Sequence, residues 1–284
     1  MTAQILQSKQ IVQKLKEEIK AEALALKERG TELKLATILA GGDEPSRAYA
    51  MSKKKACESL GISFSLETFP DDVSEDILLN TINSLNADPL VTGIMLELPL
   101  PKTIDPVRVS AAIKPEKDVD GVTPVNRGLL LLGRLEESLL PVTPQSCVAL
   151  IDSTGTDLKG KDVALIGRGE TVGLPLMVLL IKRSATVTVC HSKTKDLTEK
   201  VKKADIVVTA TGQKGLVKKD MLSPGQIVID AGITVLPDGK IVGDVEKGAA
   251  EVVSHISPVP GGVGSLTVVL LLKNLIKGAK LQKK

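Results

Sequence analysis

Hydrophobic and polar positions along the first half of the chain predict helices and strands in alternation. Residues 10–28 place Ile11, Leu15 and Ile19 among charged residues at close to helical spacing, and Gly30 ends the pattern. Short apolar runs then predict strands at residues 33–39, 62–67 and 91–96, with helices at 46–60 and 74–86. Repeated alternation of this kind is typical of a parallel sheet.

The second half of the chain repeats the pattern after Pro141. A helix at residues 145–153 leads into expected strands at residues 162–166, 185–190, 205–209 and 226–230, with helical segments between them. The stretch before it, residues 99–126, is rich in Pro, Asp and Lys and has little periodicity beyond 107–113. We interpret most of that stretch as loop over the strand ends, where function is often found.

The order of these elements predicts an α/β protein of two domains. The first is a parallel-sheet α/β domain of residues 1–140 plus 266–284, and the second is a Rossmann dinucleotide-binding domain of residues 141–265. The last helix, expected at 266–277, is too long and apolar for a further Rossmann strand. We expect this C-terminal helix to return to the first domain.

Composition narrows the class of protein. The 284 residues suffice for two domains, and 43% hydrophobic with 25% charged residues excludes a disordered or fibrous chain. Without tryptophan, and with one tyrosine and two phenylalanines, the chain lacks an aromatic platform on which bases stack. The net charge of +3 is spread along the chain and forms no stripe that would follow phosphates. We therefore expect no nucleic-acid partner.

Location and metal content follow from what the sequence lacks. The first residues have neither a basic segment nor an apolar core of a signal peptide, and no apolar run reaches the length of about 18 residues that spans a membrane. Cys57, Cys147 and Cys190 are odd in number and widely spaced, which argues against both a disulfide framework and a zinc site. We expect a cytoplasmic protein without membrane contact or bound metal.

A glycine turn after the expected strand 162–166 suggests a dinucleotide. Gly167, Gly169 and Gly173 open the next helix, so backbone N–H groups at the helix start can approach a pyrophosphate. The acidic residue that would hold a ribose 2′-hydroxyl roughly 20 residues further on is missing, and Ser192 stands at the end of the following strand. Together with Arg168, this favours NADP over NAD. The glycine spacing alone fits an ordinary strand–turn–helix equally well.

Three further segments carry groups that suit catalysis. Tyr49 and Lys53 are four residues apart on an expected helix and so share one face. Glu97 follows an apolar strand, at the end where ligands of α/β proteins bind. Asp120 lies in a loop with a second carboxylate two residues earlier. Each has a plain structural alternative: a solvated lysine face, a strand-end charge in water, and a turn whose Asp side chains bind their own backbone.

Taken together, these segments resemble the methylenetetrahydrofolate dehydrogenase/methenyltetrahydrofolate cyclohydrolase family. Six ordered motifs along nearly the whole chain carry the resemblance. They are the segments 49–57 (Tyr-Ala-Met-Ser-Lys-Lys-Lys-Ala-Cys), 98–101 (Leu-Pro-Leu-Pro), 117–121 (Lys-Asp-Val-Asp-Gly), 167–173, 190–194 (Cys-His-Ser-Lys-Thr) and 258–264 (Pro-Val-Pro-Gly-Gly-Val-Gly). The resemblance implies two domains facing a cleft, a homodimer, tetrahydrofolate one-carbon derivatives bound by the first domain and NADP bound by the second.

The resemblance also implies roles for single residues. Lys53 matches the catalytic lysine, Tyr49 its neighbouring aromatic, and Asp120 the carboxylate that hydrogen-bonds the pterin. The other implied substrate contacts are Glu97, Leu98, Pro260, Gly261, Gly262, Val263 and Gly264. The implied cofactor contacts are Thr143, Gly167, Arg168, Gly169, Ser192 and Ile233. The implied activity is oxidation of 5,10-methylenetetrahydrofolate to the methenyl form, followed by hydrolysis to 10-formyltetrahydrofolate with the lysine as general base.

Three departures from the family pattern stand in this chain. Glu97 replaces a usual Gln, Val142 replaces a common Cys, and Gly169 replaces a frequent Ser. Only the first touches the chemistry: a carboxylate beside Lys53 would keep the lysine protonated, so we expect the dehydrogenase activity to exceed the cyclohydrolase activity. Two alternatives stay open, another two-domain NADP dehydrogenase and a non-catalytic dinucleotide-binding module, although a module would need no folate-binding residues.

Overall fold

The computed structural model describes residues 2–42 and 44–283. Its segments form two units, each with its own sheet. One unit comprises Lys14–Leu140 and Val268–Lys284 and is called the three-stranded unit below. The other comprises Met1–Gln13 and Pro141–Thr267 and is called the Rossmann unit. The predicted two-domain α/β class is confirmed.

Strand β2 (Lys34–Ala40) is the centre of the three-stranded unit. It pairs in parallel with β3 (Ser63–Phe69) on one side and with β4 (Gly93–Leu96) on the other. Helix α2 (Glu44–Ser59) connects β2 to β3, and α3 (Glu75–Ala87) connects β3 to β4. These elements lie within two residues of the predicted bounds, which is the usual uncertainty of helix and strand ends.

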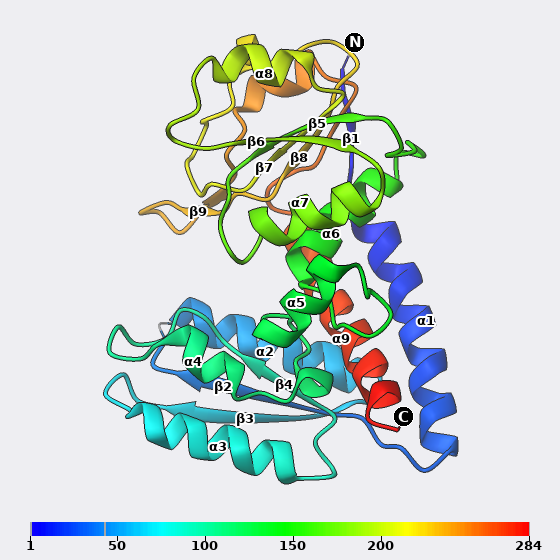
Figure 1. Ribbon diagram of the computed structural model, residues 1–284, viewed down its shortest axis with the longest axis vertical. Coiled ribbons are helices and arrows are strands. Elements are labelled where there is room, and N and C mark those ends of the chain that lie inside the picture. Colours follow the sequence, from blue (N-terminus) through cyan, green and yellow to red (C-terminus); the bar gives the residue numbers. More distant parts are fainter. Residues whose placement is uncertain (1, 43, 284) are drawn as a thin grey trace. The chain divides into compact units, whose positions relative to one another are not determined.

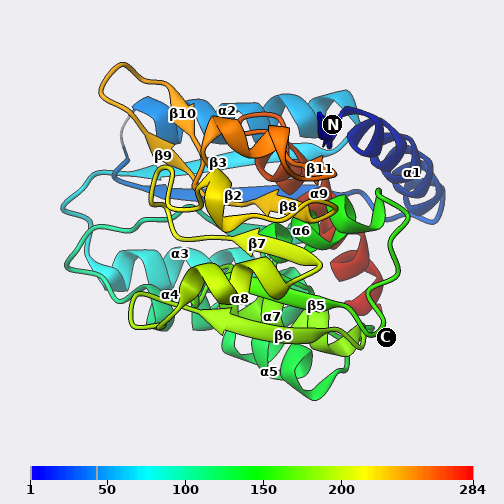
Figure 2. The ribbon, with the colours of Figure 1, turned by 90° about the horizontal axis from the view of Figure 1, so that it is seen from above.

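The two faces of this sheet are covered by different helices. Ala36 and Ile38 point to the face covered by α3, where they form one buried cluster with Leu78 and Ile82. Helix α2 lies on the opposite face (Figures 1 and 2). Because side chains alternate across a strand, β2 supplies buried residues to both faces. Helix α2 is thereby held against the sheet, and Lys53 lies on it.

The stretch 99–126 contains more helix than we predicted. Helix α4 (Pro106–Ala111) begins after Asp105, whose side chain accepts a hydrogen bond from Val107 N at 2.9 Å. A 3-10 turn, η1 (Pro115–Lys117), and α5 (Pro124–Leu132) follow. All three begin with Pro at the first or second helical position, which needs no amide hydrogen-bond partner there. The apolar repeat at 107–113 coincides with α4, whereas η1 and α5 lie in the part that we interpret as loop from the sequence.

Helix α9 (Val263–Leu281) places most of its length in the three-stranded unit, as predicted for the C-terminal helix. Asn274 Nδ2 donates to Val119 O at 2.8 Å and to Leu140 O at 2.7 Å, and Lys277 Nζ donates to Leu135 O at 2.6 Å. Helix α1 (Lys9–Glu28) begins in the Rossmann unit and has most of its residues in the three-stranded unit.

The Rossmann unit has a six-stranded sheet in the order β1-β11-β8-β7-β5-β6, and every pairing in it is parallel. The strands are β5 (Asp162–Ile166), β6 (Thr186–Cys190), β7 (Ile206–Thr209), β8 (Ile227–Asp230), β11 (His255–Ile256) and β1 (Gln4–Ile5). The chain passes from β5 to β6 on one side and then to β7 on the other. The order of strands therefore reverses between β5 and β7, which is where doubly wound sheets bind ligands.

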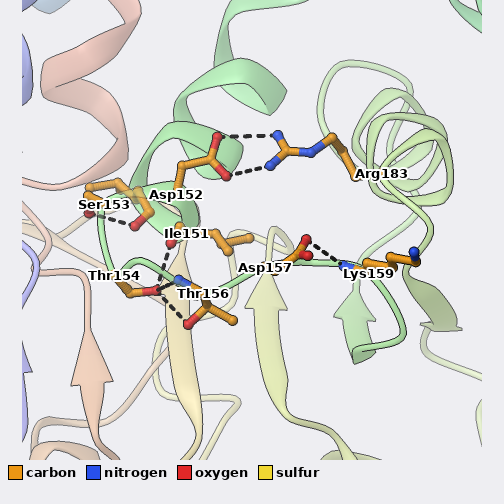
Figure 3. Close-up of polar contacts among 9 residues, drawn as sticks. Ile151, Asp152, Ser153, Thr154, Thr156, Asp157, Lys159 and Arg183 are labelled. Atoms are coloured by element: carbon orange, nitrogen blue, oxygen red, sulfur yellow. Dashed lines mark hydrogen bonds and ion pairs between the residues drawn. The ribbon is translucent and has the colours of Figure 1, made fainter.

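Helices cover both faces of this sheet. Helices α6 (Val142–Asp152) and α7 (Gly173–Lys182) lie on one side, and α8 (Leu197–Lys203) lies on the other (Figure 1). The ends of α6 and α7 are joined by the guanidinium of Arg183, which donates to both carboxylate oxygens of Asp152 at 2.8 and 3.2 Å (Figure 3). This pair is exposed, so it contributes about 1 kcal/mol or less.

The first residues of the chain differ from the predicted domain division. Strand β1 pairs in parallel with β11, with Ile5 opposite Ile256, and Ala3 is buried in the Rossmann core. This segment therefore belongs to the Rossmann unit, whereas we had assigned all of residues 1–140 to the first domain. Two residues of strand are too short for a periodic signal, so the pairing left no mark in the sequence.

Three further observations bear on class. Within residues 2–42 and 44–283, no helix is long and apolar enough to cross a membrane. The same residues contain no group of three or more His, Cys, Asp or Glu side chains that could hold a metal ion. Cys57, Cys147 and Cys190 are free and buried.

A two-stranded antiparallel ribbon, β9 (Thr234–Val235) with β10 (Ile241–Val242), projects after β8.

Candidate active site

Lys53 is a buried lysine on α2. Its side chain is 1% exposed, and its Nζ lies 2.6 Å from Oε1 of Glu97, whose side chain is 8% exposed. Tyr49, one helical turn earlier, places its ring 3.5 Å from the same Nζ, measured to the ring centroid. The helical spacing of four residues thus brings phenol and amine together as predicted. Lys53 is not a solvated helical face.

Glu97 owes its place to the end of β4. Its backbone N–H donates to Ile38 O at 2.9 Å, which continues the pairing of β4 with β2 by one residue. The peptide bond between Leu98 and Pro99, just after Glu97, is cis. The carboxylate therefore stands at the carboxyl end of β4, the parallel strand beside the central β2, and Leu98 next to it is 44% exposed.

Asp120 is held by two anchored neighbours. The ammonium group of Lys117 donates to the carbonyls of Leu85, Asn86 and Asp88 at the end of α3. The carboxylate of Asp118 accepts hydrogen bonds from the backbone of residues 122 and 123 at 3.1 and 2.8 Å, and from Asn126 Nδ2 at 2.8 Å. The loop between η1 and α5 is therefore held by hydrogen bonds on both sides of Asp120.

The electrostatics of these groups are coupled. Burial lowers the pKa of Lys53, while the charges of Glu97 and then Asp120 act in the opposite direction. Desolvation, followed by the charge of Asp118, raises the pKa of Asp120 to about 7. The site therefore holds a lysine whose neutral form is favoured by burial, and a carboxyl group, that of Asp120, that is partly protonated near neutral pH.

The glycine turn of the Rossmann unit meets the requirements of a dinucleotide site. Gly167 has φ +119°, and a Cβ on it would overlap Ala210 O at the start of the loop after β7. A Cβ on Gly173 would overlap Gly167 O, whereas one on Gly169 would meet no atom within 4 Å. Two glycines are required by close backbone packing, and the third leaves the turn open for a ligand.

The end of β6 carries no carboxylate that would bind a ribose 2′-hydroxyl. After Cys190 the chain turns, with His191 N donating to Thr194 Oγ1 at 2.8 Å, and Ser192 and Lys193 are exposed at this turn. Arg168 in the glycine turn is exposed as well. A hydroxyl group and two cations suit the 2′-phosphate of NADP. The residues present therefore fit NADP.

The remaining predicted contacts lie in the Rossmann unit. Thr143 is in the first turn of α6 and half-buried, and Ile233, which follows β8, is 58% exposed. Pro260, Gly261 and Gly262 form a loop after a cis Val259-Pro260 bond, and Val263 and Gly264 are the first residues of α9. Ser8 fixes this loop, because its Oγ and N–H both donate to Gly261 O, at 2.8 and 3.2 Å. The contacts of these residues with substrate or cofactor stay predictions.

Two groups of residues near these sites are not among the site residues predicted from the sequence. Lys117 has no role in the predictions, whereas Asp118 follows the structural alternative of a turn in which Asp side chains bind the backbone. Asp230 and Asp244 are buried at the end of the Rossmann sheet, at 3% and 0% exposure. The available signal was an acidic residue after an apolar run in each of the segments 227–232 and 241–244, with a glycine two residues after Asp230 and one residue before Asp244.

Comparison with known proteins decides the family. The catalytic domain of the tetrahydrofolate dehydrogenase/cyclohydrolase family matches residues 6–120, and its NAD(P)-binding domain matches residues 141–283. The bifunctional protein FolD 2 of Desulfitobacterium hafniense (strain Y51) is 54% identical over 283 residues, which cover 99% of each chain. The chain belongs to the tetrahydrofolate dehydrogenase/cyclohydrolase family. The resemblance inferred from the six motifs is confirmed.

Solved structures of tetrahydrofolate dehydrogenase/cyclohydrolases agree in fold. The FolD enzyme of Campylobacter jejuni superposes with a TM-score of 0.95 at 42% identity and covers 99% of each chain. The enzyme of Trypanosoma brucei, solved with NADP cofactor and an inhibitor, has a TM-score of 0.93 at 35% identity over 100% of this chain and 99% of that one. The comparisons do not support the two alternatives, another two-domain NADP dehydrogenase and a non-catalytic dinucleotide-binding module.

Proposed function

We propose that this enzyme oxidises 5,10-methylenetetrahydrofolate to 5,10-methenyltetrahydrofolate with NADP, and then hydrolyses the product to 10-formyltetrahydrofolate. The observation that carries the proposal is the buried Lys53–Glu97 pair beneath Tyr49, in a chain whose family carries out both reactions. NADP, when bound, accepts the hydride that leaves the methylene carbon. The product is a methenyl cation, and it is the substrate of the second reaction.

In the oxidation, the protein residues hold the folate and stabilise the charge that develops on it. Tyr49 offers a ring face and Asp120 a carboxyl group for the pterin, as the family resemblance implies. Glu97 places a negative charge beside Lys53, where it stabilises a cation that forms nearby. A preorganised carboxylate at a buried site lowers the energy of a transition state that gains positive charge.

In the hydrolysis, water adds to the methenyl carbon, a proton is lost, and the ring opens to the formyl product. Lys53 is the general base, which requires its neutral form. Burial favours the neutral form, and the cationic substrate favours it further, whereas Glu97 favours the ammonium form. The same carboxylate therefore assists the first step and slows the second, so the dehydrogenase activity exceeds the cyclohydrolase activity.

Binding of NADP is assigned to the glycine turn and the end of β6. Gly167 and Gly169 bring backbone amides to the pyrophosphate, and Arg168 and Ser192 contact the 2′-phosphate. Thr143 and Ile233 contact the remainder of the cofactor. What supports this assignment is the open turn at Gly169 and the lack of an acidic residue from Cys190 to Lys195.

The enzyme acts as a homodimer in the cytoplasm. What supports a dimer, besides the family resemblance, is the ribbon of β9 and β10: Val235 and Ile241 lie opposite each other and are 61% and 43% exposed. An isolated two-stranded ribbon is marginal in water, and a second copy would cover its apolar face. The three free, buried cysteines suit a reducing compartment.

The direct test is turnover of 5,10-methylenetetrahydrofolate by the purified enzyme, first with NADP and then with NAD. We expect turnover with NADP at a higher kcat/KM than with NAD. Equal or better use of NAD would refute the cofactor assignment. Failure to oxidise this substrate with either cofactor would refute the proposed function.

A further inference from the structure

We infer that Asp244, in the segment after β10, is a positioning residue for the cofactor site: it fixes the loop after β7 against the loop after β8. The inference rests on the proposed binding of NADP by the Rossmann unit. Asp244 is fully buried, at 0% exposure, and lies well outside the glycine turn in sequence. No role has so far been attached to it.

The first step is the set of hydrogen bonds at its carboxylate. Oδ2 accepts from Thr209 Oγ1 at 2.8 Å, from Thr211 N at 2.7 Å and from Thr211 Oγ1 at 2.8 Å. Oδ1 accepts from Gln213 N at 2.8 Å. One buried side chain therefore receives four hydrogen bonds from residues 209–213, the end of β7 and the loop that follows. Bonds from N–H and O–H groups to a carboxylate are about twice as strong as neutral ones.

The second step is the support of Asp244 itself by Asp230 at the end of β8. Asp230 Oδ1 accepts from the backbone N–H of Asp244 at 3.1 Å and of Gly232 at 2.9 Å, and its Oδ2 accepts from Val245 N at 2.9 Å. Asp230 N in turn donates to Ser257 Oγ at 2.8 Å. The two carboxylates thus connect the ends of β7 and β8 through side chains that exclude water.

Close packing against two glycines fixes the positions of the Asp230 and Asp244 side chains. A Cβ on Gly232, two residues after Asp230, would overlap the carboxylate of Asp244. A Cβ on Gly243, one residue before Asp244, would overlap the carboxylate of Asp230. The carboxylate of Asp244 therefore packs against Gly232, and the carboxylate of Asp230 packs against Gly243. Only glycine fits at both positions, which indicates that the distance between the two loops is fixed by direct contact.

The third step is the place of these loops in the fold. Strand order reverses between β5 and β7, so a dinucleotide binds at the carboxyl ends of these two strands. The glycine turn after β5 touches the loop after β7 through Gly167 and Ala210, and Ala210 N donates to Ile166 O at 2.8 Å. The loop after β8 meets the same loop through Thr234 Oγ1, which donates to Gly212 O at 3.0 Å. Asp244 thus lies beneath the surface on which the cofactor binds.

The consequence is selective for one of the two activities. Oxidation requires the cofactor to be held in register with the substrate, where small displacements are costly. Hydrolysis of the methenyl form transfers no hydride. Loosening the loop after β7 should therefore impair NADP binding and oxidation while hydrolysis continues. A merely structural role of Asp244 would reduce both activities together with stability.

The test is Asp244→Asn, which keeps the size of the side chain but turns one of its two acceptors into a donor facing donors. We expect the Kd of NADPH, measured by fluorescence titration, to rise about tenfold or more, as loss of hydrogen bonds to a charged group predicts. We expect the ratio of dehydrogenase to cyclohydrolase kcat to fall by a similar factor. Asp238→Asn, an exposed aspartate of the β9–β10 turn paired with Lys240, is the matched control and should change neither quantity.

A second variant keeps the test decisive if Asp244→Asn does not fold. Thr211→Val removes one hydroxyl donor to Asp244 and keeps the shape of the side chain, so we expect a rise in Kd of roughly threefold with thermal stability nearly unchanged. If Asp244→Asn binds NADPH as the wild type does, or if both activities fall in parallel with the melting temperature, the inference is wrong. If Asp244→Asn does not fold, an unchanged Kd in Thr211→Val overturns it. A wild-type enzyme that binds no NADPH would instead refute the proposed function on which the inference rests.

Discussion

Replacing Glu97 by Gln removes one charge from the active site and little else. Lys53 Nζ and Glu97 Oε1 are 2.6 Å apart and buried. For unit charges at that separation of 2.6 Å, an effective dielectric constant of about 20 gives an attraction of about 6 kcal/mol, an upper value because both ions lose hydration. About 1.4 kcal/mol, roughly a quarter of it, changes the population of neutral lysine about tenfold.

The two activities should respond in opposite directions. In Glu97→Gln the pKa of Lys53 falls further below its ordinary value, because burial acts without the opposing carboxylate. We expect the cyclohydrolase kcat near neutral pH to rise about tenfold, and the rising limb of its pH profile to move to lower pH. The dehydrogenase kcat should fall, because the developing methenyl cation loses a stabilising charge.

Both rates are measured with purified enzyme from about pH 6 to about pH 9, a range that brackets the titration of a perturbed lysine base. Glu58→Gln is a suitable control, because Glu58 lies on the same helix and its carboxylate makes an exposed ion pair with Lys54 at 3.9 Å. A fall in both activities of Glu97→Gln would refute the charge argument. It would mean that Glu97 takes part in catalysis, for example as the base that activates water.

Three more predictions concern other parts of the molecule. Arg168→Ala should raise the KM for NADP about tenfold while the KM for NAD changes little, since only NADP carries the 2′-phosphate; equal changes would remove Arg168 from the phosphate site. Asp120 has a pKa raised to about 7 in the folded state, so the folded protein binds more protons than the unfolded chain between about pH 4 and pH 7, and stability should fall as pH rises through that range. Asp120→Asn should remove this part of the decline in the free energy of unfolding, and an unchanged slope would contradict the assigned pKa. Light scattering of the intact enzyme should give twice the mass of one chain, whereas Val235→Asp should favour the monomer; a wild-type monomer would contradict the dimer.

The regular elements could be predicted because their signals are local. The four longest strands of the Rossmann sheet, β5 to β8, are mostly apolar runs of four or five residues bounded by turns, and each is predicted within one residue at both ends. The glycine turn followed from the same logic, since Gly167 and Gly173 are required by backbone contacts that no other residue allows. A strand that is buried on both faces carries its own pattern.

The bounds and pairing of elements that are defined by contacts rather than by a sequence pattern could not be predicted from the sequence alone. Strand β1 is recognisable only by its pairing with β11, which lies some 250 residues away in the chain. Helix α4 depends on a cap at Asp105 and extends over six residues. An edge strand of two residues produces no detectable period, and a helix of less than two turns produces only a short repeat, such as the one at 107–113, that does not distinguish it from a loop.

Some contacts of the candidate site follow from local spacing in the sequence, and others depend on the fold. The pairing of Tyr49 with Lys53 follows from helical spacing, and the sequence placed it correctly on one face. The contact of Lys53 with Glu97 joins residues 44 positions apart and requires the sheet to exist first. The hydrogen bonds of Asp244 to the loop after β7 span 31 to 35 positions. Such contacts are products of topology, so the sequence suggested candidates but not their partners.

The central claim is that Lys53 performs the hydrolytic step at a folate site separate from the site that binds NADP. Lys53→Met tests it most directly, because it removes the amine and leaves an apolar side chain of similar length. We expect cyclohydrolase turnover to disappear while the Kd of NADPH stays within about twofold of the wild-type value, a difference of about 0.4 kcal/mol. Full cyclohydrolase turnover in this variant, or a large loss of NADPH affinity, would contradict the claim.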